Sequence, residues 1–131
     1  MRRSRQLGFT IIELMVVISI ILILISVAVP IYSQSILKAK EAVLRQDLFT
    51  LRSAIDNYTM DKGKAPQSLD DLVQAGYLKV IPKDPFTDSS DTWQVQQEDV
   101  LMSVDQNEPG INDVHSGANG NGTDGTAYNT W

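Results

Sequence analysis

The chain has 131 residues, enough for one small domain once any membrane segment is subtracted. Its 11 basic and 16 acidic residues give a net charge of −5, and from Pro66 onward eleven acidic residues accompany two bases, Lys79 and Lys83. This negative balance argues against nucleic acid as the main partner, because like charges repel. The absence of cysteine excludes disulfides and thiolate sites.

A basic head precedes a long apolar run at the N-terminus. Arg2, Arg3 and Arg5 come before residues 14–31, an eighteen-residue stretch without a charge. At about 1.5 Å of rise per residue, this stretch has the length of a membrane span. Three arginines on one side predict an N-terminus in the cytoplasm and a C-terminal domain across the membrane.

Two simpler explanations of the apolar run stay open. A secretory signal peptide is one, since Ser26-Val27-Ala28 loosely fits a small-x-small cleavage site. An ordinary single-span anchor is the other. The anchor does not explain Glu13, a carboxylate inside an apolar segment, where ionisable groups are costly and usually functional.

The segment Gly8-Phe9-Thr10-Ile11-Ile12-Glu13-Leu14 resembles the GFTLIE signature of type IV pilins and type II secretion pseudopilins. In that family a membrane peptidase cuts after the glycine on the cytoplasmic side and methylates the new N-terminus. The resemblance therefore implies cleavage between Gly8 and Phe9, N-methylation of Phe9, and a mature chain of 123 residues, 131 minus 8. A glycine at Gly8 also lets a protease approach the backbone closely.

Glu13 and the new amine at Phe9 suggest how subunits find their register. Each charge is expensive when unpaired in lipid. A neighbouring copy shifted along the axis can place its Phe9 amine against Glu13, which satisfies both groups only in the correct register. We therefore expect Glu13 and Phe9 to direct assembly.

A single helix is predicted over residues 9–62, about 80 Å long, ending at Gly63. Pro30 predicts a kink or a locally melted turn, although proline is frequent in membrane helices. The resemblance implies that the helix around Pro30 can lose helicity as subunits pack. Beyond it, an amphipathic face is expected to hold the C-terminal domain and the opposite face to be solvated. The apolar face comprises Leu37, Leu44, Leu48, Leu51, Ile55 and Tyr58, and the charged face Lys38, Glu41, Arg45, Arg52 and Asp56.

The rest of the chain predicts a small α+β domain. A capping box at Ser68 opens a short helix that Gly76 ends. Strands are expected over residues 92–97, 100–105 and 112–116. The candidate core residues of this sheet are Trp93, Val95, Leu101 and Val104. Residues 83–86 are similar to the Asp-Pro-aromatic turn of major pseudopilins.

The C-terminal tail alternates glycine with oxygen-bearing side chains, a weak pattern for a calcium loop, and a flexible loop explains it equally well. Major pseudopilins have a C-terminal calcium loop, and the resemblance assigns Ser116, Asn119 and Asp124 as its metal ligands. Asn119 stands where aspartate is usual. His115 has no serine or cysteine motif beside it, so no enzyme site is expected.

The resemblance as a whole implies an α+β pilin fold, with a long N-terminal helix packed on a small antiparallel sheet domain. Its parts are residues 1–8 as leader, 9–31 as the transmembrane and assembly helix, 32–63 as its amphipathic continuation, and 64–131 as the globular domain. The absence of cysteine and the tail favour a major pseudopilin over a type IV pilin of a surface fibre. A monomeric membrane-anchored cation-binding module is a further alternative.

The favoured interpretation carries expectations about partners and location. The subunit would assemble with its own copies into a helical filament, a periplasmic pseudopilus for type II secretion. It would depend on a prepilin peptidase, an inner-membrane platform with its ATPase, and minor pseudopilins. Before assembly it would reside in the lipid of the bacterial inner membrane, with its C-terminal domain in the periplasm.

Overall fold

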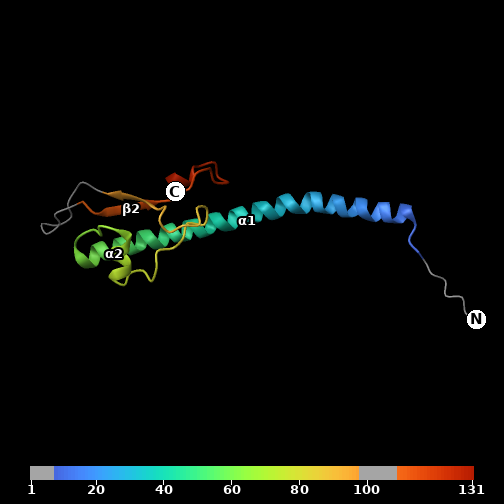
Figure 1. Ribbon diagram of the computed structural model, residues 1–131. Coiled ribbons are helices and arrows are strands. Elements are labelled where there is room, and N and C mark those ends of the chain that lie inside the picture. Colours follow the sequence, from blue (N-terminus) through green and yellow to red (C-terminus); the bar gives the residue numbers. More distant parts are fainter. Residues whose placement is uncertain (1–7, 98–108) are drawn as a thin grey trace, which may run out of the picture. The chain divides into compact units, whose positions relative to one another are not determined.

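The computed structural model describes residues 8–97 and 109–131. Its elements in chain order are α1 (Ile11–Lys62), α2 (Leu69–Gln74), β1 (Gln94–Gln97), β2 (Ile111–His115) and a 3-10 helix (Tyr128–Thr130) (Figure 1). A long helix followed by a small antiparallel sheet confirms the predicted α+β pilin fold. The chain divides into two compact units, Met1–Leu37 and Lys38–Trp131, and α1 contributes to both.

The helix α1 is bounded as the sequence predicts, to within two residues. Its first turn begins after Thr10, and its last residue is Lys62. Gly63 follows with φ of +68°, and its N–H donates to the carbonyl oxygen of Thr59 at 2.9 Å. Glycine adopts this left-handed conformation without steric cost, which explains why the helix ends there.

Pro30 lies inside α1, and every residue of the helix from Ile11 to Lys62 keeps its helical assignment. Of the two alternatives predicted at Pro30, the locally melted turn is therefore wrong for this chain taken by itself, and the kink stays a prediction. A proline removes one N–H donor from the helix, whereas melting a turn would break several further hydrogen bonds. A part for Pro30 in assembly stays a prediction.

The core of the second unit forms on the predicted apolar face of α1. Leu44, Leu48, Leu51 and Ile55 have at most 2% of their surface exposed, which confirms four of the six residues assigned to that face. Leu37 and Tyr58, at the ends of the face, are half-buried. The rest of the buried cluster comes from Ala54, Leu72, Leu78, Trp93, Ile111, Val114, Ala118 and Tyr128.

The short helix α2 forms as the sequence predicts. Ser68 is its N-cap, and the Ser68 hydroxyl and the Asp71 carboxylate each accept from the other residue's backbone N–H. This capping box satisfies two donors that the first turn would otherwise leave unpaired. Gly76, with φ of +86°, follows the C-cap Ala75 and ends the helix.

The strands β1 and β2 pair antiparallel, with Val95 opposite Val114 and a register shift between Gln96 and Gln97. They confirm the first and third predicted strands, with ends moved by one or two residues. The second predicted strand, residues 100–105, lies outside the described residues, together with Leu101 and Val104.

Trp93 and Val95 were both predicted to be core residues, and the structure confirms only the first. Trp93 is buried, and its indole N–H donates to the carbonyl oxygen of Pro82 at 2.8 Å, which confirms its prediction. Val95 is 42% exposed, so its assignment to the core is wrong. All four residues of β1 are exposed, which shows that the α1 core does not extend over this strand.

Candidate functional site

The start of α1 brings the predicted processing and assembly residues together. Phe9 is 81% exposed, and Gly8 has open space where a side chain would lie. Glu13 lies in the first helical turn, where the helix dipole favours a negative charge. Gly8 and Phe9 directly precede α1 and Glu13 lies in its first turn, so the three residues lie within one short segment of the chain. Contact between copies stays a prediction.

Thr10 is a residue of this end that the sequence reasoning missed. Its hydroxyl oxygen accepts from the backbone N–H of Glu13 at 3.2 Å, and its carbonyl oxygen accepts from Leu14 N–H at 3.1 Å. Thr10 thus caps the helix and fixes where Glu13 falls in the first turn. The spacing Thr-x-x-Glu, from Thr10 to Glu13, is a capping-box pattern and could have revealed this.

The apolar residues after Phe9 are exposed along the first half of α1. Large apolar side chains from Phe9 to Tyr32 have between 44% and 81% of their surface exposed. The helix is long and apolar enough to cross a membrane, by length and composition. A helix that is apolar on all sides needs lipid or other chains around it.

Serine hydroxyls along this segment are satisfied within the helix. Ser19, Ser26 and Ser33 donate to the carbonyl oxygens of Met15, Ile23 and Val29, at 2.7, 2.7 and 3.1 Å. Hydroxyl donors left unpaired in hydrocarbon would be costly. This bonding makes the serines compatible with an apolar environment.

Ser116 and Asp84 form a buried pair near the end of β2. Both side chains are fully buried, and the Ser116 hydroxyl donates to Asp84 Oδ2. Asp84 Oδ1 accepts from Phe86 N–H at 2.9 Å, which shapes the predicted Asp-Pro-aromatic turn. The Phe86 ring then stacks on Tyr128 of the C-terminal segment, with centroids 4.1 Å apart. Ser116 is thus committed to Asp84.

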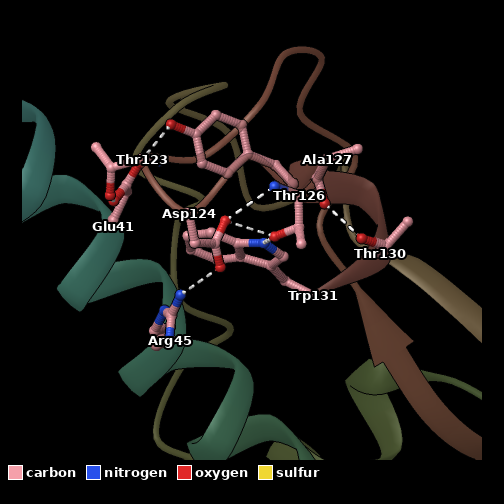
Figure 2. A network of polar contacts seen from close by, with 9 residues as sticks. Glu41, Arg45, Thr123, Asp124, Thr126, Ala127, Thr130 and Trp131 are labelled. Carbon is pink, nitrogen blue, oxygen red and sulfur yellow. Dashed lines mark hydrogen bonds and ion pairs between the residues drawn. The ribbon is translucent and has the colours of Figure 1, made fainter.

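The carboxylate of Asp124, although partly exposed, also accepts from protein donors. Its Oδ1 accepts from the N–H and the hydroxyl of Thr126 at 3.0 and 2.6 Å, and its Oδ2 pairs with Arg45 at 3.1 Å (Figure 2). The bonds from Thr126, with the Arg45 guanidinium, hold the pKa of Asp124 below its usual range. Asn119, the third predicted calcium ligand, is exposed.

As placed, these three residues do not fit a calcium ion, because protein donors already occupy the oxygens of Ser116 and Asp124. Throughout residues 8–97 and 109–131, no three histidine, cysteine, aspartate or glutamate side chains gather so as to hold a metal. Calcium binding by this loop stays a prediction of the sequence resemblance.

Glu41 of α1 anchors the loop before Asp124, although the sequence placed it on a solvated face. Glu41 is 6% exposed, and its carboxylate accepts from the N–H and hydroxyl of Thr123 at 2.8 and 2.7 Å. The Tyr128 hydroxyl donates to the same carboxylate at 3.0 Å. Burial by itself raises the pKa of Glu41, but the hydrogen bonds from Thr123 and Tyr128 outweigh it and hold the pKa below its usual range.

Arg45 and Arg52, on the same side of α1, hold the end of the described chain. The Arg45 guanidinium lies 4.3 Å from the centre of the Trp131 ring, in addition to its ion pair with Asp124. Arg52 donates to Asp113 Oδ1 at 2.7 Å and to the main-chain oxygens of Val114 and Trp131 at 2.8 and 2.7 Å. We call Glu41, Arg45 and Arg52 the α1 clamp.

A family model and several curated proteins are similar in sequence to this chain. The family model described as "Prokaryotic N-terminal methylation motif" matches residues 3–29. A protein of Aeromonas hydrophila named "Type II secretion system core protein G" is 36% identical, and the match covers 66% of this chain and 71% of that protein. Proteins of the same name from Pseudomonas aeruginosa and Escherichia coli are 35% and 36% identical, with 66% and 63% of this chain and 72% and 68% of theirs covered. No solved structure matches with comparable significance.

Proposed function

Since this chain belongs to the family of type II secretion system core protein G, we propose that it is a major pseudopilin, processed between Gly8 and Phe9 and assembled into a filament. The methylation motif over residues 3–29 carries this proposal. The exposed apolar surface of α1 supports it, since that surface needs lipid before assembly and neighbouring helices afterwards. Members of this family are structural proteins.

The location and the partners follow from this assignment. The single apolar helix at the N-terminus fits a membrane-anchored secretion subunit. We place the C-terminal domain in the periplasm, since the arginines precede the span. The filament would grow from an inner-membrane platform driven by an ATPase, after cleavage by a prepilin peptidase, and would include minor pseudopilins.

The processing step is tested on the mature protein itself. Mass spectrometry of the protein purified from membranes should find methylated Phe9 as the first residue. A functional protein that still carries residues 1–8 would contradict the proposal, because Phe9 would then have no free amine to pair with Glu13.

The assembly step is tested by removing the carboxylate of Glu13. We expect Glu13→Ala and Glu13→Gln to insert into the membrane normally and to lose filament formation, because the Phe9 amine of the neighbouring copy is left unpaired. Ser19→Ala is the matched control, since the Ser19 hydroxyl is satisfied within its own helix. Normal filament yield from both Glu13 variants, measured by cross-linking in native membranes and electron microscopy of isolated envelopes, would remove Glu13 from the mechanism.

Two rival functions make different predictions. A type IV pilin would form long fibres on the surface of the native cell, whereas a pseudopilin stays within the envelope. A monomeric anchored module would remain unassembled after leader cleavage. The identity of the neighbouring genes separates the first rival from the proposal, and cross-linking in native membranes separates the second.

A further inference from the structure

The C-terminal segment of this chain is closed by three side chains of one helix. Glu41, Arg45 and Arg52 are separated by four and seven positions, which places them on one side of α1. Each makes a polar contact with residues after Asn119: Glu41 with Thr123 and Tyr128, Arg45 with Asp124, and Arg52 with the main-chain oxygen of Trp131.

The clamp uses both signs of charge, and each charge meets a matched partner. The carboxylate of Glu41, which is nearly buried, has three donors from the loop, so its burial leaves no acceptor unsatisfied. The guanidinium of Arg45 supplies positive charge to Asp124 and lies over the ring of Trp131. A bound cation beside Asp124 would supply the same positive charge.

The backbone of the loop is also closed without a ligand. Gly122 N–H donates to Thr126 O at 2.7 Å, and Tyr128 N–H donates to Gly120 O at 3.1 Å. A side chain at Gly122 would overlap the ring of Trp131, so the loop and the ring pack directly on each other. The carbonyl oxygens of Gly120 and Thr126 therefore accept hydrogen bonds within the loop and do not need an ion.

We propose that the α1 clamp takes the place of a bound cation, so that the C-terminal loop of this chain folds without calcium. The Arg45 guanidinium neutralises Asp124, Glu41 gathers the donors of Thr123 and Tyr128, and Arg52 fixes the main chain at Trp131. The inference concerns the loop alone and holds whether or not the chain forms a filament.

The first test uses the wild-type full chain in detergent, with calcium chloride as the probe. We expect the melting temperature, and the hydrogen exchange of residues 119–131, to be the same in millimolar calcium as in excess chelator. A higher melting temperature or slower exchange in calcium would overturn the proposal. This measurement needs no variant, so a failure to fold cannot obscure it.

The second test removes two charges of the clamp, those of Glu41 and Arg45. Glu41→Gln and Arg45→Met should speed exchange of residues 119–131 about tenfold in chelator, and Arg45→Lys should restore part of the protection. The matched controls are Asp56→Asn and Lys40→Met, exposed charges of α1 outside the clamp. Unchanged exchange in both clamp variants, or equal acceleration in the controls, would overturn the proposal.

Discussion

Single buried polar groups decide how the C-terminal domain is held together. Asp84 is a fully buried carboxylate, and a carboxylate is tolerated in such a place only when its oxygens are satisfied. Phe86 N–H and the Ser116 hydroxyl meet this need from two segments that are far apart in the chain. The Asp84–Ser116 bond therefore ties the turn at residues 83–86 to the end of β2.

Replacing Ser116 removes a donor from that buried carboxylate. Ser116→Ala should lower the free energy of unfolding by about 1 to 3 kcal/mol, because Asp84 Oδ2 is left without its partner. Thermal melting followed by near-ultraviolet circular dichroism of the tryptophans measures the change, in chelator. Asn57→Ala, at an exposed position of α1, is the control and should leave the melting curve unchanged. An equally stable Ser116→Ala would mean that water replaces the hydroxyl.

Arg52 connects three separate oxygens, and a lysine cannot reproduce its planar geometry. Arg52→Met should destabilise the domain by about 1 to 2 kcal/mol, the lower part of the range for charged hydrogen bonds, since about a third of the side chain is exposed and water screens the pair. Arg52→Lys should recover less than half of this loss. Chemical denaturation of both variants provides the comparison, and full recovery by lysine would show that charge alone matters.

The anchoring roles of these charged residues could not be derived from local patterns. From the sequence, Glu41, Arg45 and Arg52 are expected on a solvated face, because charges opposite an apolar stripe usually face water. Their partners lie 61 to 87 residues further along the chain, and no periodicity reports contacts at that separation. In contrast, the Gly8–Leu14 segment identified the family because its information is contained in seven consecutive residues.

The helix α1 is one uninterrupted element, but its two halves have different surroundings: the first half is exposed and the second half packs against the C-terminal domain. Its first half is apolar and exposed, whereas its second half buries one stripe of leucine and isoleucine together with Glu41 and Ala54. The pattern of side chains therefore changes along the helix, although the backbone does not. The same change predicts that substitutions in the second half will be far more costly on its buried side than on its exposed side.

Leu48 and Val43 provide a matched pair within that half. Leu48→Ala should cost about 2 to 5 kcal/mol of stability, because Leu48 is 2% exposed and its loss leaves a cavity in the core. Val43→Ala should change stability by less than about 0.5 kcal/mol, since Val43 is 49% exposed. Thermal melting of the two variants gives the comparison. A stable Leu48→Ala variant would mean that the core does not rest on this helix.

Helices were predictable from the sequence to a greater extent than the sheet. Both helices have sequence signals at their ends, such as Gly63 and the Ser68 capping box, and these fixed the bounds to within two residues. Strand faces have no comparable signal, because a shift of one residue reverses them. Val95 was assigned to the wrong face for this reason, while Trp93, which precedes β1, is buried as predicted.

At the scale of the whole molecule, the acidic C-terminal unit is held by carboxylates whose charged form is favoured in the folded state. The Asp113 carboxyl is partly buried, which raises its pKa, but Val114 N–H, Arg52 and His115 together hold that pKa below its usual range. The pKa values of Glu41 and Asp124 are lowered in the same sense. Asp47 is the exception, because burial and the nearby Asp84 charge raise its pKa.

These directions set the pH dependence of folding. A carboxyl group with a lowered folded pKa contributes stability that is fully present above its unfolded value, about 4, and is lost as the pH falls through the folded value. The melting temperature should therefore drop from about pH 4 downward, as Glu41, Asp113 and Asp124 take up protons. Asp47 acts in the opposite direction, since a raised folded pKa means that its charged form costs stability at neutral pH.

Two variants separate these contributions in melting curves recorded from pH 7 to pH 3. Glu41→Gln should be less stable than the wild type at pH 7 and should lose less stability on acidification, because it has one fewer proton to bind. Asp47→Asn should melt higher than the wild type at pH 7 and close to it at pH 3, where Asp47 is already protonated. If acidification affected Glu41→Gln and the wild type equally, Glu41 would not contribute to the loss of stability in acid, and Asp113 and Asp124 would have to account for it.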